Sequence, residues 1–149
     1  MIDTSVLDQL VSQAVDDGVQ QLVVGAIVQH EGTVLLLKRP ADDFMGGIYE
    51  LPSGKVEGAE TLDIATAREV EEETGLVVTE LTDYLGSFDY TSGSGKKTRQ
   101  FNFAVTVVDA EEIKLTEHDS YLWVSLNDEL PVTEAVKEVF ERYRELGAG

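Results

Sequence analysis

The sequence has no cysteine and few positive charges, and both shortages limit what the protein can do. Without cysteine it has neither a disulfide framework nor a thiol nucleophile. Its 11 lysine and arginine residues face 29 aspartate and glutamate residues, which gives a formal net charge of −18. Such a charge disfavours binding to DNA, RNA or an anionic membrane, so we expect neither a nucleic-acid polymer nor a membrane as partner. Adaptation to high intracellular salt and a plainly acidic surface both explain the charge.

Long hydrophobic runs are absent as well. No stretch of 18 apolar residues and no charged-then-apolar leader occurs, so we expect a cytoplasmic protein. At 149 residues with 42% hydrophobic content, the chain is long enough for one well-buried domain and short for two. We divide it into an N-terminal amphipathic helix at residues 1–19 and a single domain at residues 20–149.

The N-terminal segment has apolar residues at helical spacing. Residues 4–17 predict a helix with Thr4 or Ser5 as its N-cap and Gly18 at its end. An amphipathic helix needs a surface that covers its apolar side. It packs either on the domain's own sheet or on a second subunit, so the sequence is compatible with a monomer or a homodimer.

The rest of the chain alternates strand and helix patterns. We expect a mixed β-sheet between helices, an α/β fold. The strands are expected at residues 21–29, 33–39, 49–51, 76–90, 98–108 and 121–125, and a closing helix at residues 133–146.

Between these strands lies an unusual concentration of carboxylates, Arg68-Glu-Val-Glu-Glu-Glu73. Because a helix advances about 100° per residue, Glu69, Glu72 and Glu73 share one face and Glu71 points away from it. Ile64, Ala67 and Val70 form a second stripe, which we expect to face the core.

Carboxylates at these spacings repel one another, and the repulsion grows where water is partly excluded. A single Arg68 cannot neutralise three glutamates. A hard divalent cation with oxygen ligands, Mg²⁺ or Mn²⁺, is the natural counter-ion. A solvated acidic helix surface is the alternative that the helix alone leaves open.

The wider pattern decides between these two interpretations. Gly54, Glu60, Arg68-Glu69-Val70, Glu72-Glu73 and Gly75-Leu76 stand at the spacing of the Nudix box, and the chain resembles that family over about residues 20–146. The resemblance implies a Nudix α/β/α sandwich with a mixed β-sheet and a loop-helix-loop catalytic motif. It also implies a nucleotide substrate, a nucleoside diphosphate linked to another group, hydrolysed with bound Mg²⁺ (Mn²⁺ possible).

The resemblance also assigns roles to residues. The metal ligands are expected to be Glu69, Glu72 and Glu73, the Gly54 carbonyl, and Glu117 in a later loop. Arg68 is expected to orient the glutamates and Glu60 to support the loop. Either Glu69 or Glu117 takes the proton from the attacking water, and the spacing does not decide between them.

Residues before the box resemble the MutT-like nucleoside triphosphate pyrophosphohydrolases. Arg39, Met45, Glu50 and Lys55 stand at the spacing found there, so Arg39, Glu50 and Lys55 are expected to bind substrate. Arg99, in the one concentrated basic segment, is a further candidate, with hairpin solubility as the alternative for that segment.

One departure concerns the base. Thr133 is expected to bind substrate. It stands where members specific for oxidised guanine carry an asparagine, however, and a hydroxyl cannot pair with a base as an amide does. The resemblance implies that a nucleoside triphosphate is hydrolysed to the monophosphate and pyrophosphate, and Thr133 argues against specificity for 8-oxo-dGTP. An ADP-ribose or nucleotide-sugar pyrophosphatase and a non-catalytic ligand sensor are the alternatives.

Three other residues are expected to have ordinary positions. His118, alone in an acidic loop, is expected at the surface, with a role as ligand or proton carrier as the alternative. His30, beside a hairpin turn, is also expected at the surface. Trp123 lies inside a strand pattern and is expected to pack in the core.

Overall fold

A computed structural model of the chain describes residues 2–39, 48–109, 113–115, 118, 120–125 and 132–148. Its helices and strands, in chain order, are α1 (Thr4–Asp16), β1 (Gln21–His30), β2 (Thr33–Lys38), β3 (Tyr49–Glu50), β4 (Ser53–Lys55), α2 (Leu62–Thr74), β5 (Val78–Thr91), β6 (Lys97–Val107), β7 (Ser120–Ser125) and α3 (Glu134–Ala148).

The strands form one mixed sheet in which β1 is the central element. The order β3-β2-β1-β6-β5 contains one parallel pair, β1 with β6, while β4 pairs with β1 and β7 pairs with β2 in antiparallel fashion. Strand β1 changes neighbours along its length. Its first half pairs with β4 and its last residues pair with β2.

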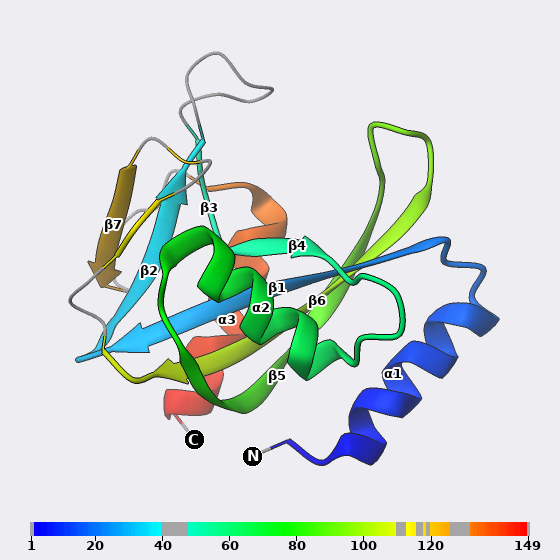
Figure 1. Ribbon diagram of the computed structural model, residues 1–149, viewed down its shortest axis with the longest axis horizontal. Coiled ribbons are helices and arrows are strands. Elements are labelled where there is room, and N and C mark those ends of the chain that lie inside the picture. Colours follow the sequence, from blue (N-terminus) through cyan, green and yellow to red (C-terminus); the bar gives the residue numbers. More distant parts are fainter. Residues whose placement is uncertain are drawn as a thin grey trace.

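The sheet separates two hydrophobic layers, because successive side chains of a strand point to opposite faces. Val24, Ala26 and Val28 of β1 face α1 and α2, whereas Ile27 faces α3. Figure 1 shows α2 in front of the sheet and α3 behind it. The predicted α/β sandwich with a mixed sheet is confirmed.

Helix α1 packs on the sheet of its own chain. Leu7 and Ala14 are buried in the layer that α2 also covers. Its N-cap is Asp3, whose Oδ1 accepts from the Ser5 amide at 2.9 Å, so the prediction of Thr4 or Ser5 as the cap was wrong by one position. Aspartate is as good a cap as serine, and only the path of the chain selects it.

Helix α2 buries only part of the stripe predicted to face the core: Val70 is buried and Ile64 is not. Ile64 is 56% exposed, while Thr66 and Thr74 are buried on the sheet side with Val70. Each threonine hydroxyl donates to the carbonyl four residues earlier, Thr66 to Leu62 at 2.7 Å and Thr74 to Val70 at 2.5 Å. These local bonds satisfy the hydroxyls and permit their burial. The expectation for Ile64 was wrong because hydrophobicity alone selected the stripe.

The other elements lie close to their predicted places, with one addition. Residues 53–55 form β4, an edge strand that the sequence did not predict. Within the described residues, no helix is long and apolar enough to cross a membrane.

Candidate active site

The carboxylates of α2 lie over the edge of the sheet that β4 forms. The helix ends at Gly75, whose positive φ of 75° suits glycine and whose amide donates to the Glu71 carbonyl at 2.8 Å. Near this end, the buried Glu73 accepts a hydrogen bond from the Ser53 amide of β4 at 3.2 Å. The last turn of α2 is thereby attached to β4, the strand that leads into the loop at residues 56–61.

Arg68 joins that loop to the helix. Its Nε and Nη2 donate to the two Glu60 oxygens at 2.7 and 2.8 Å, and Nη2 also donates to the Lys55 carbonyl at 2.9 Å. A bidentate arginine-carboxylate pair fixes both groups in orientation. The hydrogen bonds from Arg68, and then the one from the Glu57 amide, lower the pKa of the Glu60 carboxyl to about 2.

The same guanidinium holds two of the predicted metal ligands. Nη1 donates to Glu69 at 2.8 Å and to Glu72 at 3.1 Å. Glu69 is 12% exposed and Glu72 is 58% exposed. Burial raises the pKa of Glu69, and the charges of Glu72 and Glu57 add to this effect while Arg68 opposes it. Glu69 is thus a partly desolvated carboxylate beside a second, exposed one.

A glycine is required at position 54 because the backbone of β4 lies very close to α2 there. A Cβ built on Gly54 would lie 2.1 to 2.4 Å from the carboxylate atoms of Glu69. Any side chain at this position would displace that carboxylate. The absence of a side chain therefore lets the backbone of the loop lie against a predicted metal ligand.

The donor chemistry of this place fits a hard divalent cation. Two of its carboxylates, Glu69 and Glu72, accept hydrogen bonds from the same nitrogen of Arg68, so they already need a positive charge between them. Carboxylate oxygens are the ligands that such a cation prefers. Among the described residues, no three acidic or histidine side chains converge on one point. Glu117, the ligand predicted from another loop, lies outside the described residues, as does Met45. The exposed Glu72 has room to turn toward an ion.

A second polar cluster joins Arg39, Glu50 and His118. Glu50 of β3 is shared: one oxygen lies 2.8 Å from His118 Nε2 and the other 3.4 Å from Arg39 Nη1. The His118 side chain is only 6% exposed, so the expectation of a surface position was wrong. Its partner lies 68 residues earlier in the chain, and no local pattern indicates that pairing.

Arg99 and Thr133, both predicted to bind substrate, have protein partners. Arg99 donates to both oxygens of Asp89 at 2.7 and 3.0 Å and lies 3.0 Å from Asp17 at the end of α1. The Thr133 hydroxyl accepts from the Val136 amide at 3.4 Å in the first turn of α3. Lys55 is exposed beside Gly54. Substrate contact by these residues stays a prediction.

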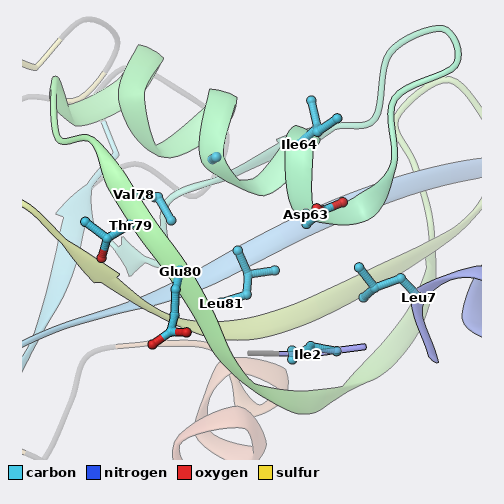
Figure 2. Close-up of a pocket in the computed structure, with 9 residues that line it drawn as sticks. Ile2, Leu7, Asp63, Ile64, Val78, Thr79, Glu80 and Leu81 are labelled. Carbon is cyan, nitrogen blue, oxygen red and sulfur yellow. The ribbon is translucent and has the colours of Figure 1, made fainter. Parts of the chain in front are cut away.

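Another concavity lies away from the carboxylates, between α1, α2 and β5 (Figure 2). Its volume is about 190 Å³, and it is lined by Ile2, Leu7, Asp63, Ile64, Ala67, Val78, Thr79, Glu80 and Leu81. None of the residues predicted to bind metal or nucleotide lines it. The candidate site is therefore the acidic end of α2 with β4, and not this apolar hollow.

Several known proteins are similar to this chain in sequence or in structure. The NUDIX domain model matches residues 19–145. The nucleoside triphosphatase NudI of Escherichia coli O17:K52:H18 is 33% identical over 120 residues, which cover 73% of this chain and 84% of that protein. The crystal structure of the MutT protein from Methanosarcina mazei Go1 is 32% identical, with a TM-score of 0.74 and coverage of 87% of this chain and 96% of that one.

A further relative matches over a shorter segment. The 8-oxo-dGTP diphosphatase of Proteus vulgaris is 39% identical over 61 residues, which cover 41% of this chain. The match spans about half of that relative, 54% of its length.

Proposed function

Because this chain belongs to the NUDIX domain family, we propose that it is a Mg²⁺-dependent pyrophosphohydrolase of nucleotides. The substrate we propose is a nucleoside triphosphate, which is hydrolysed to the monophosphate and pyrophosphate. The observation that carries this proposal is the set of Glu69, Glu72 and Glu73 on α2, with Arg68 bonded to the first two.

The metal would be held by those three carboxylates, the Gly54 carbonyl and Glu117. A bound divalent ion neutralises phosphoryl oxygens and lowers the pKa of a bound water. Arg68 keeps Glu69 and Glu72 close together, and its bonds to Glu60 and Lys55 hold the loop at the required distance. Arg68 is thus a positioning residue in this proposal. Glu69 or Glu117 accepts the proton of the attacking water.

The substrate's negative charge would be met by local cations. The overall charge of −18 repels a triphosphate, so its capture depends on groups beside the site. Lys55 lies next to Gly54 on the exposed side of the loop, which supports a contact with phosphate. Arg39, at the end of β2, is the second proposed contact.

Selectivity for oxidised guanine is not part of the proposal. The Thr133 hydroxyl already accepts from the Val136 amide, which supports a role in beginning α3. A single hydroxyl also cannot supply the paired donor and acceptor that base recognition by an amide uses. We therefore expect broad use of nucleoside triphosphates.

Turnover of a panel of nucleotides with Mg²⁺ tests the proposal. The panel contains nucleoside triphosphates, 8-oxo-dGTP and ADP-ribose, with identification of the products. We expect pyrophosphate from the triphosphates and a loss of at least about 100-fold in kcat for Glu72→Gln and Glu73→Gln, since each removes a charged metal ligand. Unchanged rates in both variants would reject the mechanism, and ribose phosphate as the main product would reject the substrate class.

A further inference from the structure

The side chain of His118 is buried although the sequence around it is acidic and polar. Its side chain is 6% exposed, in contrast with 39% for His30, the other histidine of the chain. A hydrogen bond from the ring lowers the cost of burying a histidine to this degree. The position of His118 is therefore determined by a hydrogen bond as well as by packing.

The hydrogen-bond partner of the His118 ring is Glu50. His118 Nε2 lies 2.8 Å from Glu50 Oε1, and since a carboxylate accepts hydrogen bonds, Nε2 carries the proton. The other ring nitrogen, Nδ1, is buried and has no hydrogen-bond partner among the described residues. Among the described residues, the imidazole is therefore held by a single hydrogen bond, the one with Glu50.

Glu50 has a second contact, which leads to the proposed substrate site. Its Oε2 lies 3.4 Å from Nη1 of Arg39, and both side chains are 28% exposed. An arginine side chain has many rotamers, so a carboxylate directs its guanidinium only if the carboxylate is itself fixed. The 2.8 Å bond from buried His118 supplies that restraint, because it stops the Glu50 head group from rotating.

We propose that His118 is a positioning residue for nucleotide binding: it fixes Glu50, and Glu50 directs Arg39 toward the phosphates. This inference rests on the proposed function, because it takes Arg39 to be a contact for nucleotide phosphates. Under it, Glu50 acts by holding Arg39, since both of its oxygens have protein partners. Positioning of this kind affects how tightly the substrate binds more than the chemical step.

Substitution at His118 separates this role from packing. His118→Phe fills the same space without a donor, whereas His118→Gln places an amide nitrogen near the position of Nε2. We expect His118→Phe to raise KM for a nucleoside triphosphate about tenfold with kcat within about twofold, and His118→Gln to restore KM to within about threefold. His30→Phe is the matched control and leaves KM unchanged.

A double-mutant cycle shows whether the effect passes through Arg39. If His118 acts by directing that guanidinium, His118→Phe adds nothing to the rise in KM caused by Arg39→Ala. Glu50→Gln is expected to raise KM as His118→Phe does. Additive effects of His118→Phe and Arg39→Ala would overturn the inference.

Binding of a non-hydrolysable nucleoside triphosphate in Mg²⁺, measured by calorimetry, keeps this inference distinct from the proposed function. Absence of turnover in the wild type would reject the function, while the Kd series of His118→Phe, His118→Gln and His30→Phe would still test His118. Equal Kd values for wild type and a folded His118→Phe would overturn the inference alone. So would a loss in His118→Phe that His118→Gln does not restore. Absence of nucleotide binding by the wild type would overturn both.

Discussion

Arg68 reduces the repulsion between the carboxylates of helix α2. Its three guanidinium nitrogens contact Glu60, Glu69, Glu72 and the Lys55 carbonyl. In doing so, one side chain fixes the relative position of a loop and a helix. The carboxylates on the acidic face of α2 therefore have defined positions. Gly54 contributes to this arrangement, because its backbone lies against Glu69.

Substitution of Gly54 is expected to damage metal binding more than stability. In Gly54→Ala, the three atoms nearest the new Cβ all belong to the carboxylate of Glu69, the far end of a flexible side chain that can move away. We expect a loss of less than about 1 kcal/mol in the free energy of unfolding and a fall of about tenfold or more in affinity for Mn²⁺. Gly93→Ala is the control, because nothing lies within 4 Å of its Cβ position. Unchanged Mn²⁺ affinity in Gly54→Ala would contradict this prediction.

The ion pair of Glu60 predicts a specific dependence of stability on pH. Its pKa is lowered from 4.5 to about 2 in the folded protein, chiefly by Arg68. Since the folded pKa lies below the unfolded one, ionised Glu60 stabilises the fold fully above about pH 4.5, and this contribution is lost as the pH falls through about 2.

The check is a comparison of denaturant midpoints for the wild type and Glu60→Gln across that window. We expect the wild type to be the more stable protein near neutral pH, and the difference to shrink between pH 4.5 and about 2. A difference that stays constant as the pH falls would show that the carboxylate charge is not what holds the loop.

At the level of elements, α1 is attached to the sheet by a polar contact as well as by its apolar face. Arg99 of β6 reaches Asp17, directly after the end of α1, and Asp89 of β5. The contact therefore joins three elements that are distant in sequence. It gives Arg99 a structural role beside the predicted contact with nucleotide.

The two roles predict different results for Arg99→Gln. The contacting carboxylates, Asp17 and Asp89, are 38% and 40% exposed, so we expect a loss of only about 1 kcal/mol in the free energy of unfolding. If Arg99 acts through these ion pairs alone, KM for a nucleoside triphosphate stays within about twofold. Lys96→Gln, an exposed cation of the same hairpin, serves as the control. A large rise in KM with unchanged stability would show that Arg99 serves the substrate instead.

The elements that the sequence predicts well are those with a strong local pattern. Strands β1 and β6 alternate or run apolar over many residues, and both lie within two residues of their expected bounds. Strand β4 escaped prediction because Ser53-Gly54-Lys55 has no such pattern, and its pairing with β1 depends on a distant partner. Elements with a regular pattern follow from local periodicity, whereas a short strand such as β4 follows from tertiary pairing.

The same distinction applies to the site. The spacing of Glu69, Glu72 and Glu73 along one helix is local information, so the sequence could indicate them. The pairing of His118 with Glu50 joins positions 68 residues apart. The burial of the His118 side chain depends on the assembled fold, so a local pattern does not indicate it. Likewise, the approach of Gly54 to Glu69 is visible only when the loop lies on the helix.

At the scale of the whole molecule, the negative net charge opposes the binding of an anionic substrate. With a net charge of −18, the protein repels polyanions at long range, and an anionic nucleotide must be held by local positive charge. Salt weakens the long-range repulsion more than it weakens contacts inside the site. The account therefore depends on a cation at the acidic end of α2.

Binding of Mn²⁺ measured by electron paramagnetic resonance tests that claim most directly. Wild-type protein is titrated beside Glu69→Gln, Glu72→Gln and Glu73→Gln, with Glu71→Gln, on another face of the same helix, as the matched control. We expect each of the three substitutions to weaken Mn²⁺ binding about tenfold or more and Glu71→Gln to leave it unchanged. Equal Mn²⁺ affinity in the wild type and all four variants would contradict the account.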